Sequence, residues 1–334
     1  MMTRRSPSRG LPESGIALLL ACLSILLAGC ANHTIYHPRK NPPGITTWSE
    51  QVLRGRLLLR LQWAKPEGPG PFPAVLVHPE ANHEAREMRG VIRELAAAGY
   101  LAVAADYKRM ANGVIREPLF TWQDPDDPRA LLDLVRRRPD VDPERIGALG
   151  FSQGGVYSLL IAAYTGQIRA VVAYYPVTDF STWLREASKG NAGRRFVFRL
   201  IRRSFRKQTG VKSAEELDEI LGRASAMRQA EAIRAPVLLV HGDRDTTAPL
   251  GESERLAAKL KELGREVELV VVPNARHVFN WMDREQARTA WEPTLRWLDR
   301  HLKEEGDGSQ TSAPTRKHKP RKTSGSGFGQ AESR

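Results

Sequence analysis

Six short apolar runs recur along the middle of the chain, and segments with helical periodicity separate them. The runs cover residues 74–77, 101–105, 146–149, 170–173, 237–240 and 267–272. Strands that lack polar alternation are typical of sheets buried on both faces. Between the first two runs, Met88, Val91, Ile92 and Leu95 recur at helical spacing before Gly99. The pattern predicts the α/β class, with a mostly parallel central sheet of about eight strands and helices on both faces.

The length of 334 residues fits one such domain with terminal segments, because single α/β domains reach about 250 residues. Apolar residues make up 41% and charged residues 27%, which excludes a wholly disordered or fibrous chain. About sixty residues separate the runs at 170–173 and 237–240, too many for a plain crossover, so we expect a helical cap insertion at about 180–232. An early strand is expected within 53–63. The predicted divisions are a signal peptide at 1–29, a tether at 30–50, the main domain at 51–303 and a disordered basic tail at 304–334.

The N-terminal segment has the features of an export signal. Three arginines precede the apolar run 15–27, which is short for a membrane span. The run ends in Leu27-Ala28-Gly29-Cys30, which resembles the lipobox of bacterial lipoproteins. The resemblance implies that Cys30 is acylated and anchors the chain to a membrane of the cell envelope, on the periplasmic side of the outer membrane in a Gram-negative host. The alternative is an uncleaved signal anchor with an unrelated cysteine.

The formal net charge of +13 raises the question of an acidic partner. One basic cluster lies in the tail at 316–322. A second lies in the expected cap, where five arginines share one helical arc and Phe196, Val197, Leu200, Ile201 and Phe205 share the other. The basic arc is a solvated face or a contact for acidic lipid headgroups or acidic substrate. Because we expect an exported protein, we do not expect nucleic acid as a partner.

A candidate nucleophile lies in Gly150-Phe151-Ser152-Gln153-Gly154, between the run 146–149 and a helical segment at 156–163. A serine hydroxyl is a weak nucleophile, so it needs an imidazole to take its proton and a carboxylate to orient that imidazole. The flanking glycines permit the sharp strand-to-helix turn that exposes such a serine. The only cysteines are Cys22 and Cys30, so a cysteine nucleophile in the main domain is excluded. The sequence therefore predicts Ser152 as the nucleophile.

The expected partners follow in the chain order acid, then histidine. Asp243 and Asp245 follow the run 237–240, and His277 follows the run 267–272. The residues alone leave the choice between the two aspartates open, because either could be a turn residue that hydrogen-bonds its own backbone.

Three segments, namely 145–155, 236–245 and the loop at His277, resemble the dienelactone hydrolase family of the α/β-hydrolase superfamily. The catalytic parts of prolyl-oligopeptidase-type enzymes are similar. The resemblance covers roughly Arg56 to Leu302 and implies a Ser152, His277 and Asp245 triad, with Asp243 near the turn. Such a triad needs no metal and no cofactor, and we expect neither.

Two backbone N–H groups should stabilise the oxyanion of the tetrahedral intermediate. The N–H of Gln153, directly after the nucleophile, is the first. The second is expected in the loop His78-Pro79-Glu80-Ala81. Many relatives carry His-Gly in this loop, whereas Pro79 has no N–H, so we assign the second donor to Ala81.

Glu80, Tyr107 and Tyr175 are candidate substrate-pocket residues. Glu80 matches a glutamate that dienelactone hydrolases carry in this loop, although their nucleophile is commonly a cysteine. The tyrosines, with Tyr174, follow strands at the edge where the site should lie, and core packing is the alternative for them. His78, Glu80, His83 and Glu84 could also be read as metal ligands, but their spacing matches no zinc motif.

These features favour hydrolysis of a small carboxylic ester or lactone through an acyl-enzyme intermediate. The first alternative is a serine peptidase of the prolyl oligopeptidase type. No repeat at the blade spacing of a propeller precedes the expected catalytic core, which favours small substrates. The second alternative is an envelope binding protein that keeps the fold without activity.

Overall fold

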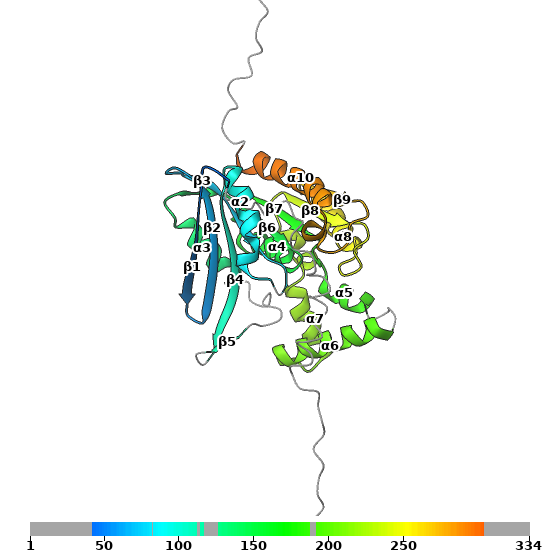
Figure 1. The fold of residues 1–334 in the computed structure, drawn as a ribbon. Coiled ribbons are helices and arrows are strands. Elements are labelled where there is room, and N and C mark those ends of the chain that lie inside the picture. The colour runs from blue at the N-terminus through cyan, green and yellow to red at the C-terminus, as the bar shows by residue number, and fades with distance from the viewer. Residues whose placement is uncertain (1–41, 82, 112–113, 117–125, 188–191, 304–334) are drawn as a thin grey trace, which may run out of the picture.

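The computed structural model describes residues 42–81, 83–111, 114–116, 126–187 and 192–303. These residues form one large sheet with helices on both faces (Figure 1). The strands are β1 (Ile45–Arg54), β2 (Leu57–Pro66), β3 (Phe72–His78), β4 (Leu101–Ala111), β5 (Val114–Arg116), β6 (Val141–Phe151), β7 (Ala170–Tyr174), β8 (Val237–Gly242) and β9 (Val267–Val272).

The strand order is β1-β2-β4-β3-β6-β7-β8-β9, and β5 pairs with the end of β4. β1 and β2 are antiparallel to their neighbours, whereas β4, β3, β6, β7, β8 and β9 run parallel. The predicted α/β class is confirmed. The ninth strand, β5, arises because β4 continues beyond the apolar run at 101–105 and the chain turns back on it.

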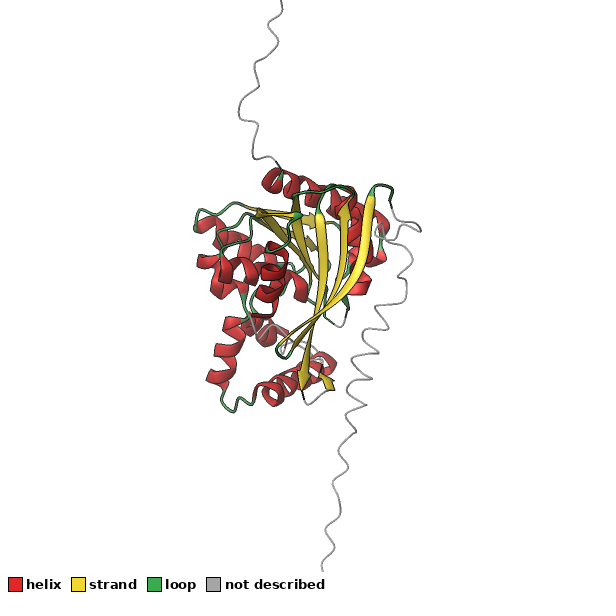
Figure 2. Ribbon diagram, turned by 90° about the vertical axis from the view of Figure 1, so that its left-hand side faces the viewer, coloured by secondary structure: helices red, strands yellow, loops and turns green. Residues whose placement is uncertain are grey.

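Helices cover the two faces of the sheet (Figure 2). Each face has its own apolar core. Residues of α3, α4 and α8 pack in one core, and residues of α2, α9 and α10 pack in the other. The helices are η1 (Ala85–Met88), α2 (Arg89–Ala97), α3 (Asp126–Arg136), α4 (Gln153–Thr165), α5 (Phe180–Ala187), α6 (Ala192–Thr209), α7 (Ala214–Arg223), η2 (Ala226–Ala232), α8 (Gly251–Glu262), α9 (Phe279–Met282) and α10 (Arg284–Leu302).

The first two strands correct the prediction for the N-terminal part of the domain. The segment 30–50 was expected to be a tether throughout, but β1 begins at Ile45, and the single strand expected within 53–63 is two strands joined at Gly55. Trp48 of β1 stacks on Trp63 of β2 with 5.5 Å between ring centroids, and the guanidinium of Arg138 lies over both rings. β1 is an edge strand with no fully buried side chain, so it lacks the apolar run by which the inner strands were recognised.

The segment between β7 and β8 contains α5, α6, α7 and η2. α5, α6 and α7 extend beyond the layers that cover the sheet (Figure 1), whereas residues of η2 belong to the core on one sheet face. On α6, the five arginines at 195, 199, 202, 203 and 206 are exposed. Phe196, expected on the apolar arc, is 52% exposed. Phe198 instead packs against Trp183 of α5, at 4.8 Å between ring centroids. Among the described side chains of α6, Phe198, which lies outside the predicted arc, therefore contacts α5, and Phe196 of the arc does not lie in the core.

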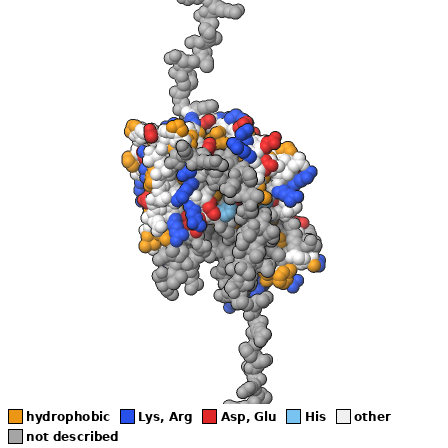
Figure 3. Space-filling model, viewed as in Figure 1, with side chains coloured by type: hydrophobic (Ala, Val, Ile, Leu, Met, Phe, Trp, Pro, Cys, Tyr) orange, Lys and Arg blue, Asp and Glu red, His pale blue; other side chains and the backbone are white. Residues whose placement is uncertain are grey.

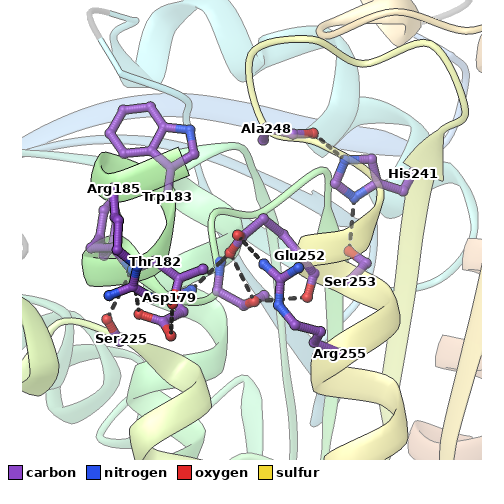
Figure 4. Close-up of polar contacts among 12 residues, drawn as sticks. Asp179, Thr182, Trp183, Arg185, Ser225, His241, Ala248, Glu252, Ser253 and Arg255 are labelled. Carbon is purple, nitrogen blue, oxygen red and sulfur yellow. Dashed lines mark hydrogen bonds and ion pairs between the residues drawn. The ribbon is translucent and has the colours of Figure 1, made fainter. Parts of the chain in front are cut away.

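The first turn of α8 holds the beginning of this inserted helical segment through hydrogen bonds (Figure 4). The buried carboxylate of Glu252 accepts hydrogen bonds from the backbone N–H groups of Thr178 and Asp179, both at 2.9 Å. The indole N–H of Trp183 donates to the carbonyl of Thr247 at 2.8 Å.

No helix among the described residues is long and apolar enough to cross a membrane.

Candidate active site

Ser152 lies at the sharp turn between β6 and α4. Its φ of 51° is in the left-handed region, which non-glycine residues rarely adopt, and its N–H donates to the carbonyl of Tyr174 at 2.9 Å. The two flanking glycines make the turn possible. A Cβ on Gly150 would lie 2.0 Å from the carbonyl oxygen of Gly154, and a Cβ on Gly154 would lie 2.0 Å from the carbonyl oxygen of His78. Backbone crowding thus presents the serine hydroxyl at the carboxyl end of the sheet.

The structure brings Ser152, His277 and Asp245 together from three separate strand ends. His277 Nε2 lies 3.0 Å from Ser152 Oγ, and His277 Nδ1 lies 2.6 Å from Asp245 Oδ2. The serine follows β6, the aspartate follows β8 and the histidine follows β9. The side chains have the connectivity needed to move a proton from the hydroxyl to the imidazole and to orient that imidazole with a carboxylate.

The two candidate aspartates occupy different environments. Asp243 is exposed, whereas Asp245 is 6% exposed. Asp245 Oδ1 accepts hydrogen bonds from the N–H groups of Thr247 at 2.8 Å and Ala248 at 2.9 Å. Burial alone would raise the pKa of Asp245, but the two histidines beside its carboxylate, His241 and His277, outweigh burial and lower the pKa to about 2. Asp245 is therefore a fully ionised acceptor at neutral pH, and the geometry selects it over Asp243.

The predicted oxyanion donors lie on two segments that cross at close range. Gln153 is the first residue of α4, where backbone N–H groups have no acceptor within the helix. The loop 78–81 runs past Gly154, as the 2.0 Å approach of the His78 carbonyl shows, and it carries Ala81, which is partly exposed. Glu80, a predicted pocket residue, is buried and pairs with His83, with 2.7 Å between the carboxylate and Nδ1.

The predicted pocket tyrosines differ in what they contact. Tyr175 packs its ring against His277, at 4.7 Å between centroids, and its hydroxyl donates to Asn280. Tyr107 hydrogen-bonds His78 Nδ1 at 3.0 Å. Tyr174 is a core residue that hydrogen-bonds α10. Tyr175 is thus a direct neighbour of the candidate base, whereas Tyr107 supports the residue that begins the 78–81 loop.

His78, the last residue of β3 and the first of this loop, is completely buried. Burial lowers its pKa to about 3, because the charged imidazolium would lose its hydration. The ring lies 6.1 Å from Tyr107 and 6.0 Å from Tyr157, centroid to centroid. His78 is therefore neutral at pH 7 and supports the loop through packing and one hydrogen bond.

The four residues weighed as metal ligands have other partners. His83 pairs with Glu80; burial would lower the pKa of His83, but the Glu80 carboxylate raises it above the usual value. Glu84 pairs with Arg86 at 2.9 Å and lies 3.9 Å from Arg60. A hollow of about 270 Å³ lies beside these residues. Three arginines and three acidic residues are among those that line it, namely Arg60, Arg86, Arg89, Glu50, Glu84 and Asp106. In Figure 3, basic side chains gather beside acidic and histidine side chains on one face of the molecule. Within the described ranges, no group of three or more His, Cys, Asp or Glu side chains is placed to hold a metal.

Sequence reasoning missed two buried polar residues at this site. Asn280, in α9, accepts the hydrogen bond of Tyr175, and His241, at the end of β8, contacts the loop that carries Asp245. The sequence offers one signal for them, the position of His241 directly before Gly242-Asp243. Asn280 has no comparable signal, because its hydrogen bond to Tyr175 joins segments far apart in the sequence. Cys30, the predicted lipidation site, lies outside the described residues.

The sheet is mostly parallel, and a serine with positive φ lies between β6 and α4. The acid follows β8 and the histidine follows β9, which together define an α/β-hydrolase fold. Residues 122–305, more than half of the chain, match the model of the prolyl oligopeptidase family, and the chain belongs to that family.

The chain is similar to proteins assigned as peptidases and to proteins assigned as carboxymethylenebutenolidases or dienelactone hydrolases. The uncharacterized peptidase YuxL of Bacillus subtilis is 28% identical over 216 residues, which are 62% of this chain but 31% of YuxL. A protein of Escherichia coli assigned as a carboxymethylenebutenolidase is 26% identical over 259 residues, 70% of this chain and 78% of its own. A crystal structure from Klebsiella pneumoniae assigned as a dienelactone hydrolase has a TM-score of 0.54 at 24% identity, over 76% of this chain and 98% of that one. The expected resemblance to dienelactone hydrolases and prolyl oligopeptidases is confirmed, and the chain belongs to a hydrolase family.

Proposed function

We propose that this protein is a serine hydrolase that cleaves a carboxylic ester or lactone through an acyl-enzyme intermediate. The observation that carries the proposal is the chain of contacts from Ser152 to His277 at 3.0 Å and from His277 to Asp245 at 2.6 Å. Ser152 Oγ attacks the carbonyl carbon while His277 Nε2 takes its proton. Asp245 holds the ring and stabilises the imidazolium that forms.

The second half of the reaction uses the same groups. His277 gives its proton to the alcohol oxygen as its bond to the acyl carbon breaks. It then takes a proton from water while the water oxygen attacks the acyl carbon, and it returns that proton to Ser152 Oγ as the acyl–Oγ bond breaks and the carboxylic acid is released. The N–H groups of Gln153 and Ala81 are the proposed donors to the oxyanion in both tetrahedral intermediates.

The match to the Escherichia coli protein supports the ester or lactone, because it covers most of both chains. The family match supports a second candidate, a peptidase with the same triad. Comparing p-nitrophenyl esters of increasing acyl length with proline and dipeptide anilides separates the two. Faster turnover of the anilides would replace the esterase proposal by the peptidase.

A fluorophosphonate probe tests the nucleophile directly. We expect the probe to label the wild-type protein and the Ser152→Ala variant to remain unlabelled, with ester turnover reduced by about 10⁴-fold or more. Ser213→Ala, which removes the partly exposed N-cap of α7, is the matched control and should label at the wild-type rate. Labelling of the Ser152→Ala protein, or a wild type that stays unlabelled, would sink the proposal and leave the non-catalytic binding protein.

We also propose that two or more acyl chains on Cys30 hold the enzyme at the envelope membrane. The support is the lipobox-like run that ends at Cys30. In a bacterial host with lipoprotein processing, we expect the wild type in the membrane pellet and Cys30→Ser outside it, with Cys22→Ser as the control that stays in the pellet. A Cys30→Ser protein that still sediments would indicate an uncleaved signal anchor.

A further inference from the structure

His241 is a fully buried histidine that the reaction above does not use. It is near the end of β8, four residues before Asp245. Its Nε2 lies 2.7 Å from the carbonyl oxygen of Ala248, and its Nδ1 lies 2.7 Å from the hydroxyl of Ser253 (Figure 4). Both ring nitrogens thus have a partner within hydrogen-bond distance.

The partners assign the hydrogens of the ring. The carbonyl of Ala248 can only accept, so His241 Nε2 carries a hydrogen and donates it. With one ring proton, Nδ1 has a free lone pair, and the hydroxyl of Ser253 donates to it. The Ala248 carbonyl therefore selects the tautomer with the hydrogen on Nε2, and the Ser253 hydroxyl, which can donate or accept, donates to Nδ1.

Ala248 is held at both ends of its backbone. Its N–H donates to Asp245 Oδ1 at 2.9 Å, and its carbonyl accepts from His241. The same His241 Nε2 lies 3.5 Å from Asp245 Oδ2, the oxygen that accepts from His277. His241 thus binds the residue that donates to Oδ1 of Asp245, and it lies beside Oδ2.

From these contacts we infer that His241 is a positioning residue for the reaction, holding the turn 245–248 so that Asp245 keeps its bond to His277. The inference rests on the proposed function. Among the described residues, the polar contacts of His241 are with Ala248, Ser253 and Asp245, and none is with Ser152. His241 therefore acts through Asp245. Its loss should let the carboxylate rotate away from His277, which weakens proton transfer without altering how the substrate binds.

Two substitutions separate this role from simple packing. Glutamine places its amide nitrogen close to the position of the histidine Nε2 and can still donate to Ala248, whereas leucine fills a similar volume with no donor. We expect His241→Leu to lower kcat for p-nitrophenyl acetate by about 10- to 100-fold with KM within about twofold, and His241→Gln to stay within about fivefold of wild type. The rate of fluorophosphonate labelling at Ser152 should fall in parallel with kcat.

His301→Leu is the matched control, since His301 packs on Trp297 of α10. Thermal unfolding of each variant gives the folded fraction for normalising kcat. Equal losses for the leucine and glutamine variants, an effect on KM alone, or a leucine variant with wild-type kcat and labelling rate would each overturn the inference. A wild-type protein that the probe does not label would instead overturn the proposed function.

Discussion

The Asp245→Asn enzyme should lose about 10⁴-fold in kcat for ester substrates while it binds them as before. Asp245 Oδ1 is fixed by two backbone N–H groups, from Thr247 and Ala248. The amide NH₂ of an asparagine must therefore take the position of Oδ2 and face His277 Nδ1. The imidazole would then carry its hydrogen on Nε2, toward Ser152, where it cannot accept the serine proton.

Asp243→Asn is the matched control, because Asp243 is exposed and two residues away. We expect it to keep kcat within about twofold of wild type, since exposed substitutions away from the site have small effects. Steady-state kinetics of both variants, with circular dichroism to verify folding, make the comparison. A larger loss in Asp243→Asn would transfer the role of acid to that residue.

Gly154→Ala should reduce activity by at least about 100-fold and also destabilise the protein by about 1–3 kcal/mol. The new Cβ would lie 2.0 Å from the His78 carbonyl oxygen and 2.5 Å from that of Pro79. Both contacts are with backbone, so the loop that carries Ala81 must move away from Gln153. The separation of the two proposed oxyanion donors is what lowers the rate.

Gly251→Ala is the control for this substitution. A Cβ there would lie 3.1 Å from the end of the flexible Arg255 side chain, which can shift. We expect wild-type kcat/KM and a free energy of unfolding within about 1 kcal/mol of wild type, measured by urea denaturation. If Gly154→Ala were as active as Gly251→Ala, the loop 78–81 would not carry an oxyanion donor.

The inner part of the fold could be predicted because burial on both sheet faces leaves a strong mark. Strands such as β7, whose residues are all buried, and helices such as α2 end close to where the apolar pattern ends. β1 carries no such mark, because its fit depends on Trp48 meeting Trp63 and Arg138 from elsewhere in the chain. The exposure of Phe196 has a similar origin, since periodicity predicts an apolar arc but not which side chain of α6 meets Trp183.

The candidate site was predictable to the extent that its residues lie in short motifs at strand ends. Ser152, Asp245 and His277 each follow an apolar run, and parallel strands bring those ends to one edge. From the sequence, Asp245 could be chosen over Asp243 only by resemblance to a known family. The folded turn is what exposes Asp243 and gives the Asp245 carboxylate three hydrogen-bond donors. His241 and Asn280 stayed hidden since their partners are brought near only by tertiary packing.

The hydrogen bond from the Trp183 indole to the Thr247 carbonyl restricts how this enzyme can be re-engineered. A chimera that received the cap of a homologue would lose the donor that meets the turn 245–248 from outside. Exchange of the segment between β7 and β8 should therefore succeed best when the graft keeps a tryptophan at 183, because this hydrogen bond joins the inserted segment to the turn that carries Asp245.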